Sequence, residues 1–187
     1  MKIDNVFVYG LEEAVRAAKF PMSVNPSALT KELTDGLKRL SACPIGEGHD
    51  NWLNGVLVQF DLTASLKFWP QLQRYHFIDF VSSQSTMHRI TKFDIAAQCN
   101  SYVLPATITT LQGLVKAYND DPTPDNYLKI LYNIPSGFEL TARMTTNYRQ
   151  LKTIYRQRRT HRLPEWQMLC DWIEGLPNSE LRTGGDR

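Results

Sequence analysis

Two stretches of the chain alternate apolar and polar residues in the way that a half-buried β-strand requires. They cover residues 54–65 and 137–147, and a shorter apolar stretch covers residues 6–9. The apolar positions of the long stretches are Val56, Val58, Phe60 and Leu62 in the first, and Phe138, Leu140, Ala142 and Met144 in the second. Because successive side chains of a strand point to opposite faces, each pattern predicts a strand with one face against a core.

Helical spacing of apolar residues, supported by prolines and cap residues, predicts helices between these strands. In chain order, the predicted helices cover residues 11–20, 25–42, 66–80, 106–118, 125–132, 147–162 and 164–176. We expect Asn25 and Asn147 to be N-caps, Pro26 and Pro164 to lie in first turns, and Pro70 to interrupt its helix. Strands and helices alternate irregularly, so we predict an α+β fold with a central, mostly antiparallel sheet and flanking helices.

The size and composition of the chain predict a single domain. It has 187 residues, of which 42% are hydrophobic and 11% aromatic, which is enough for a sizeable core. We expect one domain over residues 1–177 and a flexible C-terminal tail over residues 178–187, because the sequence NSELRTGGDR is polar and rich in glycine.

The cysteines, histidines and apolar runs bear on compartment and metal binding. Cys43, Cys99 and Cys170 lie far apart with no C-x-x-C pair, which argues against a disulfide framework or a zinc site. The four histidines lack a close ligand spacing with an acid, so we expect no metal. The start lacks a signal-peptide pattern and no apolar run approaches the ~18 residues that span a bilayer, so we expect a cytoplasmic protein without a membrane partner.

One stretch concentrates positive charge. The sequence NYRQLKTIYRQRRTHR, residues 147–162, has five arginines, one lysine and no acid, although the whole chain has a net charge of only +2. The basic face of the predicted helix has Arg149, Lys152 and Arg156, and the apolar face has Leu151, Ile154 and Tyr155. Any cationic function must therefore be local.

Three roles are open for these bases. For any single base, the ordinary role is a solvated charge on a helix face. A grip on nucleic acid is possible but not favoured, because the total charge is nearly balanced. A nucleotide-sized anion fits this balance better, and the planar fork of arginine suits phosphate or carbonyl oxygens.

The sequence IPSGFELTARMTTNYRQLKTIYRQRRTHRLPEWQ, residues 134–167, resembles the flavin-dependent thymidylate synthase family. Asn147 and Arg149 match the family's Asn-x-Arg at the start of a long helix, and Arg158 matches an arginine nine residues after the first. Upstream, GEGHDNWLNGVLVQFDL looks like the family's Gly-His loop and strand. QLQRYHFIDFVSSQS looks like its Arg-His-Arg signature followed by a serine segment.

This resemblance implies a fold of that family, its cofactors and a set of site residues. The residues implied to bind flavin adenine dinucleotide (FAD) are Arg74, His76, Asn147 and Arg149. Those implied to bind the substrate, deoxyuridine monophosphate (dUMP), are Ser83, Gln84, Ser85, His88 and Arg89. Arg158 is the implied catalytic residue, a cation that polarises the uracil. NADPH and methylenetetrahydrofolate are implied co-substrates, and a homotetramer with active sites between its subunits is the implied assembly.

The chain also departs from the family pattern. Its signature reads Arg74-Tyr75-His76 instead of Arg-His-Arg, and Met87-His88 stands where an Arg-Tyr follows the serine. Losing two charge-assisted hydrogen bonds of roughly 1.5–3 kcal/mol each weakens binding by roughly 10²–10⁴-fold. Two functions therefore follow. The first is dUMP methylation or a related one-carbon transfer to a pyrimidine deoxynucleotide. The alternative is a catalytically inactive fold that binds a nucleotide, nucleic acid or protein partner.

Overall fold

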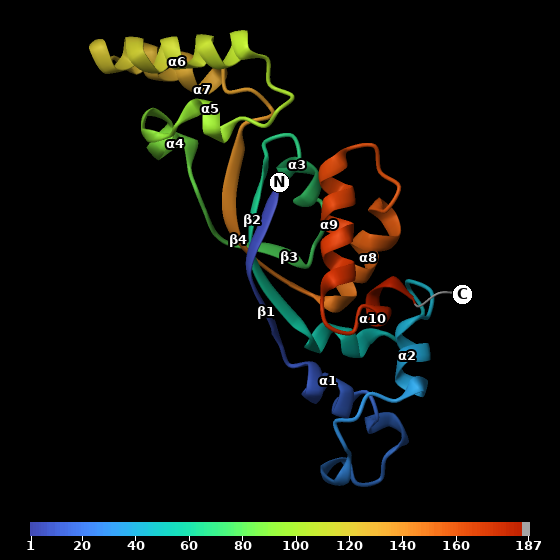
Figure 1. Ribbon diagram of the computed structural model, residues 1–187. Helices are drawn as coiled ribbons and strands as arrows, with labels where there is room; N and C mark the ends of the chain where they lie inside the picture. The colour runs from blue at the N-terminus through green and yellow to red at the C-terminus, as the bar shows by residue number, and fades with distance from the viewer. Residues whose placement is uncertain (185–187) are drawn as a thin grey trace.

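A four-stranded antiparallel sheet forms the centre of the protein in the computed structural model, which describes residues 1–184 (Figure 1). Its strands are β1 (Lys2–Tyr9), β2 (Leu57–Ser65), β3 (Ile78–Ser83) and β4 (Glu139–Asn147), and their order in the sheet is β1-β2-β4-β3. All three neighbouring pairs are antiparallel. The predicted α+β fold with a central antiparallel sheet is therefore confirmed.

Helices cover one face of this sheet and gather at its two ends. The α-helices are α1 (Leu11–Ala17), α2 (Asp35–Ser41), α3 (Trp69–Leu72), α4 (Thr86–Arg89), α5 (Ile95–Gln98), α6 (Pro105–Asp120), α7 (Pro124–Tyr132), α8 (Tyr148–Arg158), α9 (Pro164–Gly175) and α10 (Glu180–Thr183). Short 3-10 turns are η1 (Phe20–Met22), η2 (Pro26–Ala28), η3 (Asn51–Gly55) and η4 (Ile90–Lys92). Helices α8 and α9 lie along the sheet, α4 to α7 lie beyond one end, and α1 and α2 lie near the other (Figure 1).

The main core lies between the sheet and the long helices. Val58, Phe60 and Leu62 of β2 are fully buried, as is Met144 of β4, and they pack with apolar residues of α8 and α9. The alternation predicted for β2 is thus confirmed. Within residues 1–184, no helix is both long enough and apolar enough to cross a bilayer.

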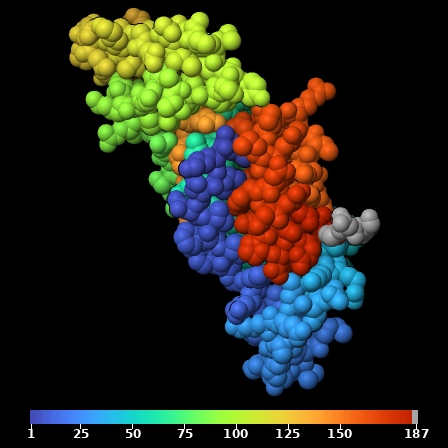
Figure 2. All heavy atoms as spheres, viewed as in Figure 1, coloured from blue at the N-terminus to red at the C-terminus, as the bar shows by residue number. Residues whose placement is uncertain are grey.

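A second, smaller core holds the helices at the far end together. It consists of Ile90, Ile95, Leu111, Ile130 and Phe138, with partly buried neighbours from α6 and α7. This end projects from the rest of the molecule, which is elongated (Figure 2). Phe138 precedes β4 and belongs to this second core, so β4 connects the two cores.

The helix predicted over residues 25–42 is wrong in its first half. The chain forms only the turn η2 after Asn25, and α2 starts much later, with the Thr34 hydroxyl accepting from the Leu37 amide at 3.4 Å. The ammonium group of Lys19 donates to the carbonyls of Thr30 at 2.9 Å and Glu32 at 2.8 Å. These bonds occupy carbonyls that a helix would use, and residues 29–33 form no helix, against their local helix propensity.

The helix predicted over residues 66–80 is also wrong beyond its first turns. After α3 the chain enters β3, whose residues pair with β4 in the register Ile78 to Thr146. The Thr146 hydroxyl also donates to the Phe77 carbonyl at 2.7 Å. Pairing with a strand more than sixty residues away has therefore overridden a helical pattern that Pro70 already weakened.

The tail predicted over residues 178–187 includes a helix in the structure, and residues 185–187 lie outside the described residues. Helix α10 occupies this region, with Leu181 and Arg182 both fully buried. The two terminal nitrogens of Arg182 donate to four carbonyls near the end of α9, and its guanidinium lies 4.0 Å from the Tyr148 ring centroid. The guanidinium thus adds donors to the carbonyls that gather at the end of α9.

Candidate functional site

The start of α8 is fixed by Asn147, as the sequence predicts. Its side-chain oxygen accepts from the Gln150 amide at 2.8 Å, and the side chain is almost completely buried. The next amide, of Tyr148, donates to the Val56 carbonyl at 3.0 Å. The cap and this backbone bond fix the first turn against the start of β2, so the direction of Arg149 follows from the fold.

A buried acid, Asp50, pairs with both cations of the first half of α8 and balances one of their two positive charges. Its carboxylate accepts from Arg149 Nε at 3.0 Å and from Lys152 Nζ at 2.5 Å. Burial acts to raise the pKa of this carboxyl, but the hydrogen bonds and charges of Lys152 and Arg149 outweigh burial and hold the pKa below its usual value. The Lys152 side chain is itself only 1% exposed and also donates to the Cys43 carbonyl at 2.7 Å.

This cluster ties the loop before β2 to the helix. Arg156 adds bonds to the carbonyls of Cys43 at 3.2 Å and Ala42 at 3.0 Å. The bases predicted to share one helix face, Arg149, Lys152 and Arg156, therefore all contact the same loop. Two of them meet an acid that is remote in sequence, so a large part of the basic stretch has a structural role.

A hollow of about 220 Å³ lies where this loop meets α8. It is lined by Ile45, Gly46, Asp50, Asn54, Phe77, Arg149, Gln150 and Thr153. Gln150 is only 7% exposed, and its amide nitrogen has no hydrogen-bond partner within residues 1–184. A buried donor without a partner costs about 1–3 kcal/mol, and Gln150 lines this hollow, so its amide is a candidate donor to an acceptor on a ligand.

At the other end of α8, Arg158 is held by aromatic residues. Its Nε donates to the Tyr75 hydroxyl at 2.8 Å, and its guanidinium lies 4.6 Å from the Trp166 ring centroid and 5.6 Å from that of Tyr75. The Trp166 indole donates in turn to Gln71 at 3.0 Å. The two terminal nitrogens of Arg158 make no hydrogen bond or ion pair to any residue that the structure describes.

The segment between α3 and α4 presents its predicted site residues in two different ways. Arg74 and His76 are exposed in the turn before β3, and neither side chain contacts a protein acid within residues 1–184. Gln84 extends the sheet instead, because its amide donates to the Thr141 carbonyl and its side-chain oxygen accepts from the Thr141 amide, both at 2.9 Å. Ser83 and Gln84 line a hollow of about 190 Å³ at the edge of the sheet.

The remaining predicted substrate residues lie around α4. Ser85 precedes this helix, and its carbonyl accepts from the amides of His88 at 3.3 Å and Arg89 at 3.0 Å. The side chains of His88 and Arg89 are exposed. Within one chain, the structure thus brings Asn147 close to Arg149 and groups the serine segment with α4, but it does not collect all predicted residues in a single hollow.

Four residues that matter at these places were not predicted as site residues: Asp50, Tyr75, Gln150 and Trp166. Asp50 directly follows the Gly-His pair of the loop, and Tyr75 stands in the middle of the altered signature, so both lay within stretches already singled out. Nothing local in the sequence identifies their partners on α8.

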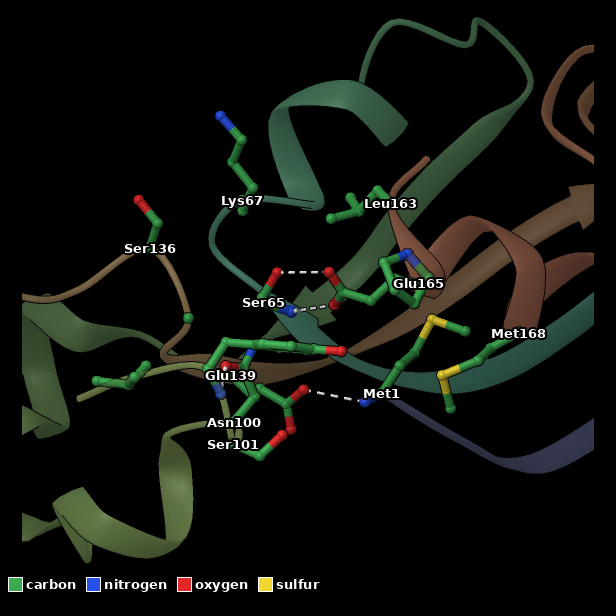
Figure 3. A pocket seen from close by; sticks show the side chains of 14 residues that line it. Met1, Ser65, Lys67, Asn100, Ser101, Ser136, Glu139, Leu163, Glu165 and Met168 are labelled. Atoms are coloured by element: carbon green, nitrogen blue, oxygen red, sulfur yellow. Dashed lines mark hydrogen bonds and ion pairs between the residues drawn. The ribbon is translucent and has the colours of Figure 1, made fainter. Parts of the chain in front are cut away.

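A third hollow, of about 660 Å³, is larger but contains none of the predicted residues (Figure 3). Glu165, only 8% exposed, accepts from the Ser65 amide at 2.9 Å and from the Ser65 hydroxyl at 2.7 Å. Glu139 accepts from the Met1 amine at 2.9 Å. The two carboxylates that line this hollow, Glu139 and Glu165, therefore already have protein partners. Over residues 1–184, no group of three or more His, Cys, Asp or Glu side chains could hold a metal ion.

Comparison with known proteins connects this arrangement to a known fold. No protein-family profile and no curated protein sequence matches the chain. Solved structures do match. Two are flavin-dependent thymidylate synthases from Helicobacter pylori complexed with FAD and dUMP. They share 13% and 14% sequence identity with the chain, at TM-scores of 0.78 and 0.79. The first match covers 100% of both chains and the second 98% of both.

A third match is a UMP/dUMP methylase, PolB, from Streptomyces cacaoi, bound with 5-Br dUMP. It shares 15% identity at a TM-score of 0.61, over 92% of this chain and 89% of that chain. The resemblance seen in the sequence is thus confirmed at the level of the fold. The chain has the fold of flavin-dependent thymidylate synthases, with a sequence that has diverged far from theirs.

Proposed function

We propose that this protein binds FAD and a pyrimidine deoxynucleotide, and that it transfers a one-carbon unit to the uracil of dUMP or a related nucleotide. The hollow lined by Arg149 and Gln150 carries the proposal, because it contains a buried amide donor with no protein partner beside a fixed guanidinium. Solved proteins of this fold are complexed with FAD and dUMP, which supports the same ligand classes here.

The residues around that hollow fit a phosphate-bearing or carbonyl-bearing ligand. The Nε of Arg149 is bound to Asp50, which leaves its terminal nitrogens to face an acceptor. Gly46 adopts a φ of 104°, and a Cβ built there would contact nothing within 4 Å, so the loop leaves open space beside the guanidinium. Asn147, Arg149 and Gln150 would hold FAD on this side, and Arg74 and His76 would reach it from the turn before β3.

Arg158 would act as the catalytic cation. A guanidinium fixed before the reaction stabilises charge that develops on a uracil carbonyl, and it does so without reorganising at the moment of reaction. Bound FAD would supply the redox chemistry, with NADPH and methylenetetrahydrofolate as co-substrates. Ser83, Gln84, Ser85, His88 and Arg89 would bind the nucleotide phosphate and sugar, through hydroxyl, amide and cationic groups suited to anions.

Assembly from several copies would complete this site. The predicted residues lie in separate places on one chain, and one face of the sheet carries no helix (Figure 1). A homotetramer in which the α4 segment of one copy faces the α8 hollow of another would bring the flavin residues and the substrate residues together. Such a partner is a second copy of this chain, and a cytoplasmic location remains the expectation.

The second candidate function is binding of a partner by a catalytically inactive protein of this fold. Two observations favour it: the altered signature leaves Arg74 and His76 exposed, and Arg149, Lys152 and Arg159 are paired with acids. The same pairing disfavours nucleic acid, since a cation already neutralised by the protein releases no counterion from phosphate.

The deciding experiment measures retention of FAD by its visible absorbance after desalting, with dUMP present, for the wild type and for Gln150→Leu. We expect retention by the wild type and a loss in the variant, together with an unchanged or raised melting temperature, because the variant removes a buried donor that lacks a partner. The control is Gln112→Leu, which alters an exposed glutamine of α6, away from α8 and from the hollow.

Each other outcome decides the question as well. No retention by the wild type at saturating FAD rejects the flavin enzyme and leaves the partner-binding fold. Retention that is equal in the wild type and in Gln150→Leu rejects the hollow as the flavin site.

A further inference from the structure

Tyr75 replaces the central histidine of the signature, and its contacts give this replacement a role. We infer that Tyr75 is a positioning residue that orients the guanidinium of Arg158 for a planar, carbonyl-bearing ring such as a pyrimidine base. The inference rests on the proposed function for the identity of the ring. The orientation of Arg158 can be tested without any ligand.

The geometry around Arg158 restricts it on two sides. Its Nε donates to the Tyr75 hydroxyl at 2.8 Å, and its Cζ lies over the Trp166 ring, 4.6 Å from the ring centroid. The rings of Tyr75 and Trp166 meet edge to face, at 5.9 Å between centroids and 66° between planes. A guanidinium bound at Nε and placed over an aromatic ring is restricted in its orientation, and its two terminal nitrogens stay available.

The hydrogen-bond direction at Tyr75 supports the same conclusion. Its hydroxyl accepts from Arg158 and donates to the side-chain oxygen of Gln157 at 3.0 Å, so both of its bonds end on neighbouring residues of α8. Tyr75 lies only a few residues before β3, whereas these residues lie at the end of α8. The hydroxyl therefore links the altered signature directly to the proposed catalytic cation.

The groups that hold Arg158, Tyr75 and Trp166, are uncharged. A carboxylate at the position of the Tyr75 hydroxyl would neutralise the guanidinium and compete with a ligand for it. A phenol and an indole fix the side chain and leave its positive charge in place. This neutral environment suits a guanidinium that binds a carbonyl oxygen of a ligand through its two terminal N–H groups.

The ligand-free test measures hydrogen exchange of the Arg158 Nε–H by NMR, in the wild type and in Tyr75→Phe. We expect exchange roughly 10-fold faster in the variant or faster still, because the variant keeps the ring but loses the acceptor. Tyr155→Phe is the matched control, since Tyr155 is a tyrosine of α8 whose hydroxyl donates to Glu174 at 2.7 Å instead. Equal exchange in the wild type and Tyr75→Phe overturns the inference.

The ligand test compares binding of dUMP with binding of deoxyribose 5-phosphate, which lacks the base. Tyr75→Phe should weaken dUMP binding by roughly 3- to 10-fold, the equivalent of one hydrogen bond, and leave deoxyribose 5-phosphate unaffected. In an Arg158→Ala background, Tyr75→Phe should have no further effect, because the residue acts through Arg158. A general structural role would weaken both ligands and would persist in that background, which would overturn the inference.

The two tests separate the two proposals. If the wild type binds no dUMP, the proposed function fails, and the exchange measurement alone decides whether Tyr75 orients Arg158. If dUMP binds and Tyr75→Phe changes neither its affinity nor the exchange, the proposed function stands and the role of Tyr75 is rejected.

Discussion

The two ends of helix α8 treat their cations in opposite ways. Near its start, Arg149 and Lys152 share the carboxylate of Asp50, which is 3% exposed. Near its end, Arg158 is held by Tyr75 and Trp166, neither of which carries a charge. Lys152, which is buried against this acid, is committed to the fold, whereas no acid competes with a ligand for Arg158. The difference shows which of several similar bases deserve testing for function.

Burial explains why the first end needs an acid. Lys152 is almost completely removed from water, and an ammonium group there without a counter-charge would be very costly. Arg158 is only half-buried, so water or a ligand reaches its terminal nitrogens. Arg182 shows a third solution, in which the two terminal nitrogens of a fully buried guanidinium donate to backbone carbonyls, while its Nε has no partner within residues 1–184.

Asp50→Ala should give the largest effect of the variants considered, because it leaves Lys152 buried without its counter-charge. We expect a loss of about 3–5 kcal/mol in the free energy of unfolding, measured by urea denaturation. Asp120→Ala is the control: it removes an acid from the exposed pair with Lys116 and should cost less than about 0.5 kcal/mol. Similar small losses of stability in both variants would show that Asp50 is not needed to stabilise the buried charge of Lys152.

Arg158→Ala should act on ligand binding more than on folding. We expect the dissociation constant for dUMP, measured by calorimetry, to rise roughly 10- to 150-fold, the equivalent of about 1.5–3 kcal/mol for a charge-assisted bond. Arg159→Ala removes the same charge from the next position, where the guanidinium is paired with Asp171 and Glu174, and should leave binding nearly unchanged. Equal weakening by both variants would mean that only the overall charge of the helix matters.

The sequence predicts those parts of the fold that local patterns determine. The strands around residues 56–64 and 139–147 and the helices α6 to α9 were expected from periodicity, prolines and the Asn147 cap, and the structure confirms them. The misplaced elements all depend on distant partners. Strand β3 needs the edge of β4, and residues 29–33 stay outside a helix, with two of their carbonyls bound by Lys19.

The candidate site shows the same division. Asn147, Arg149 and Arg158 were singled out by spacing within one helix. The acid that neutralises Arg149 lies 99 residues away in sequence and the tyrosine that holds Arg158 lies 83 away, so no local pattern indicates either contact. The sequence therefore identifies the bases of α8 but not which of them are paired with an acid.

Lowering the pH should reduce the stability that Asp50 contributes at the start of α8. The pKa of Asp50 is held below its usual value of 3.8, so its contribution to stability is present above that value and is lost as the pH falls through the lower, folded pKa. We expect the free energy of unfolding of the wild type to fall between about pH 5 and pH 2, and that of Asp50→Asn to fall less steeply. Equal slopes for the two proteins would show that Asp50 is not the charged partner of Lys152.

The smallest effect is expected for Asp171→Asn, which removes one acid from the exposed pair with Arg159. The two side chains are 41% and 64% exposed, so water and salt screen their attraction, and Glu174 still faces the same guanidinium. We expect a loss of about 0.2–1 kcal/mol in the free energy of unfolding at low salt, and no loss at high salt. Urea denaturation at the two salt concentrations measures both values. A loss as large as that of Asp50→Ala, or one that persists at high salt, would show that exposure does not separate the two kinds of pair along this helix.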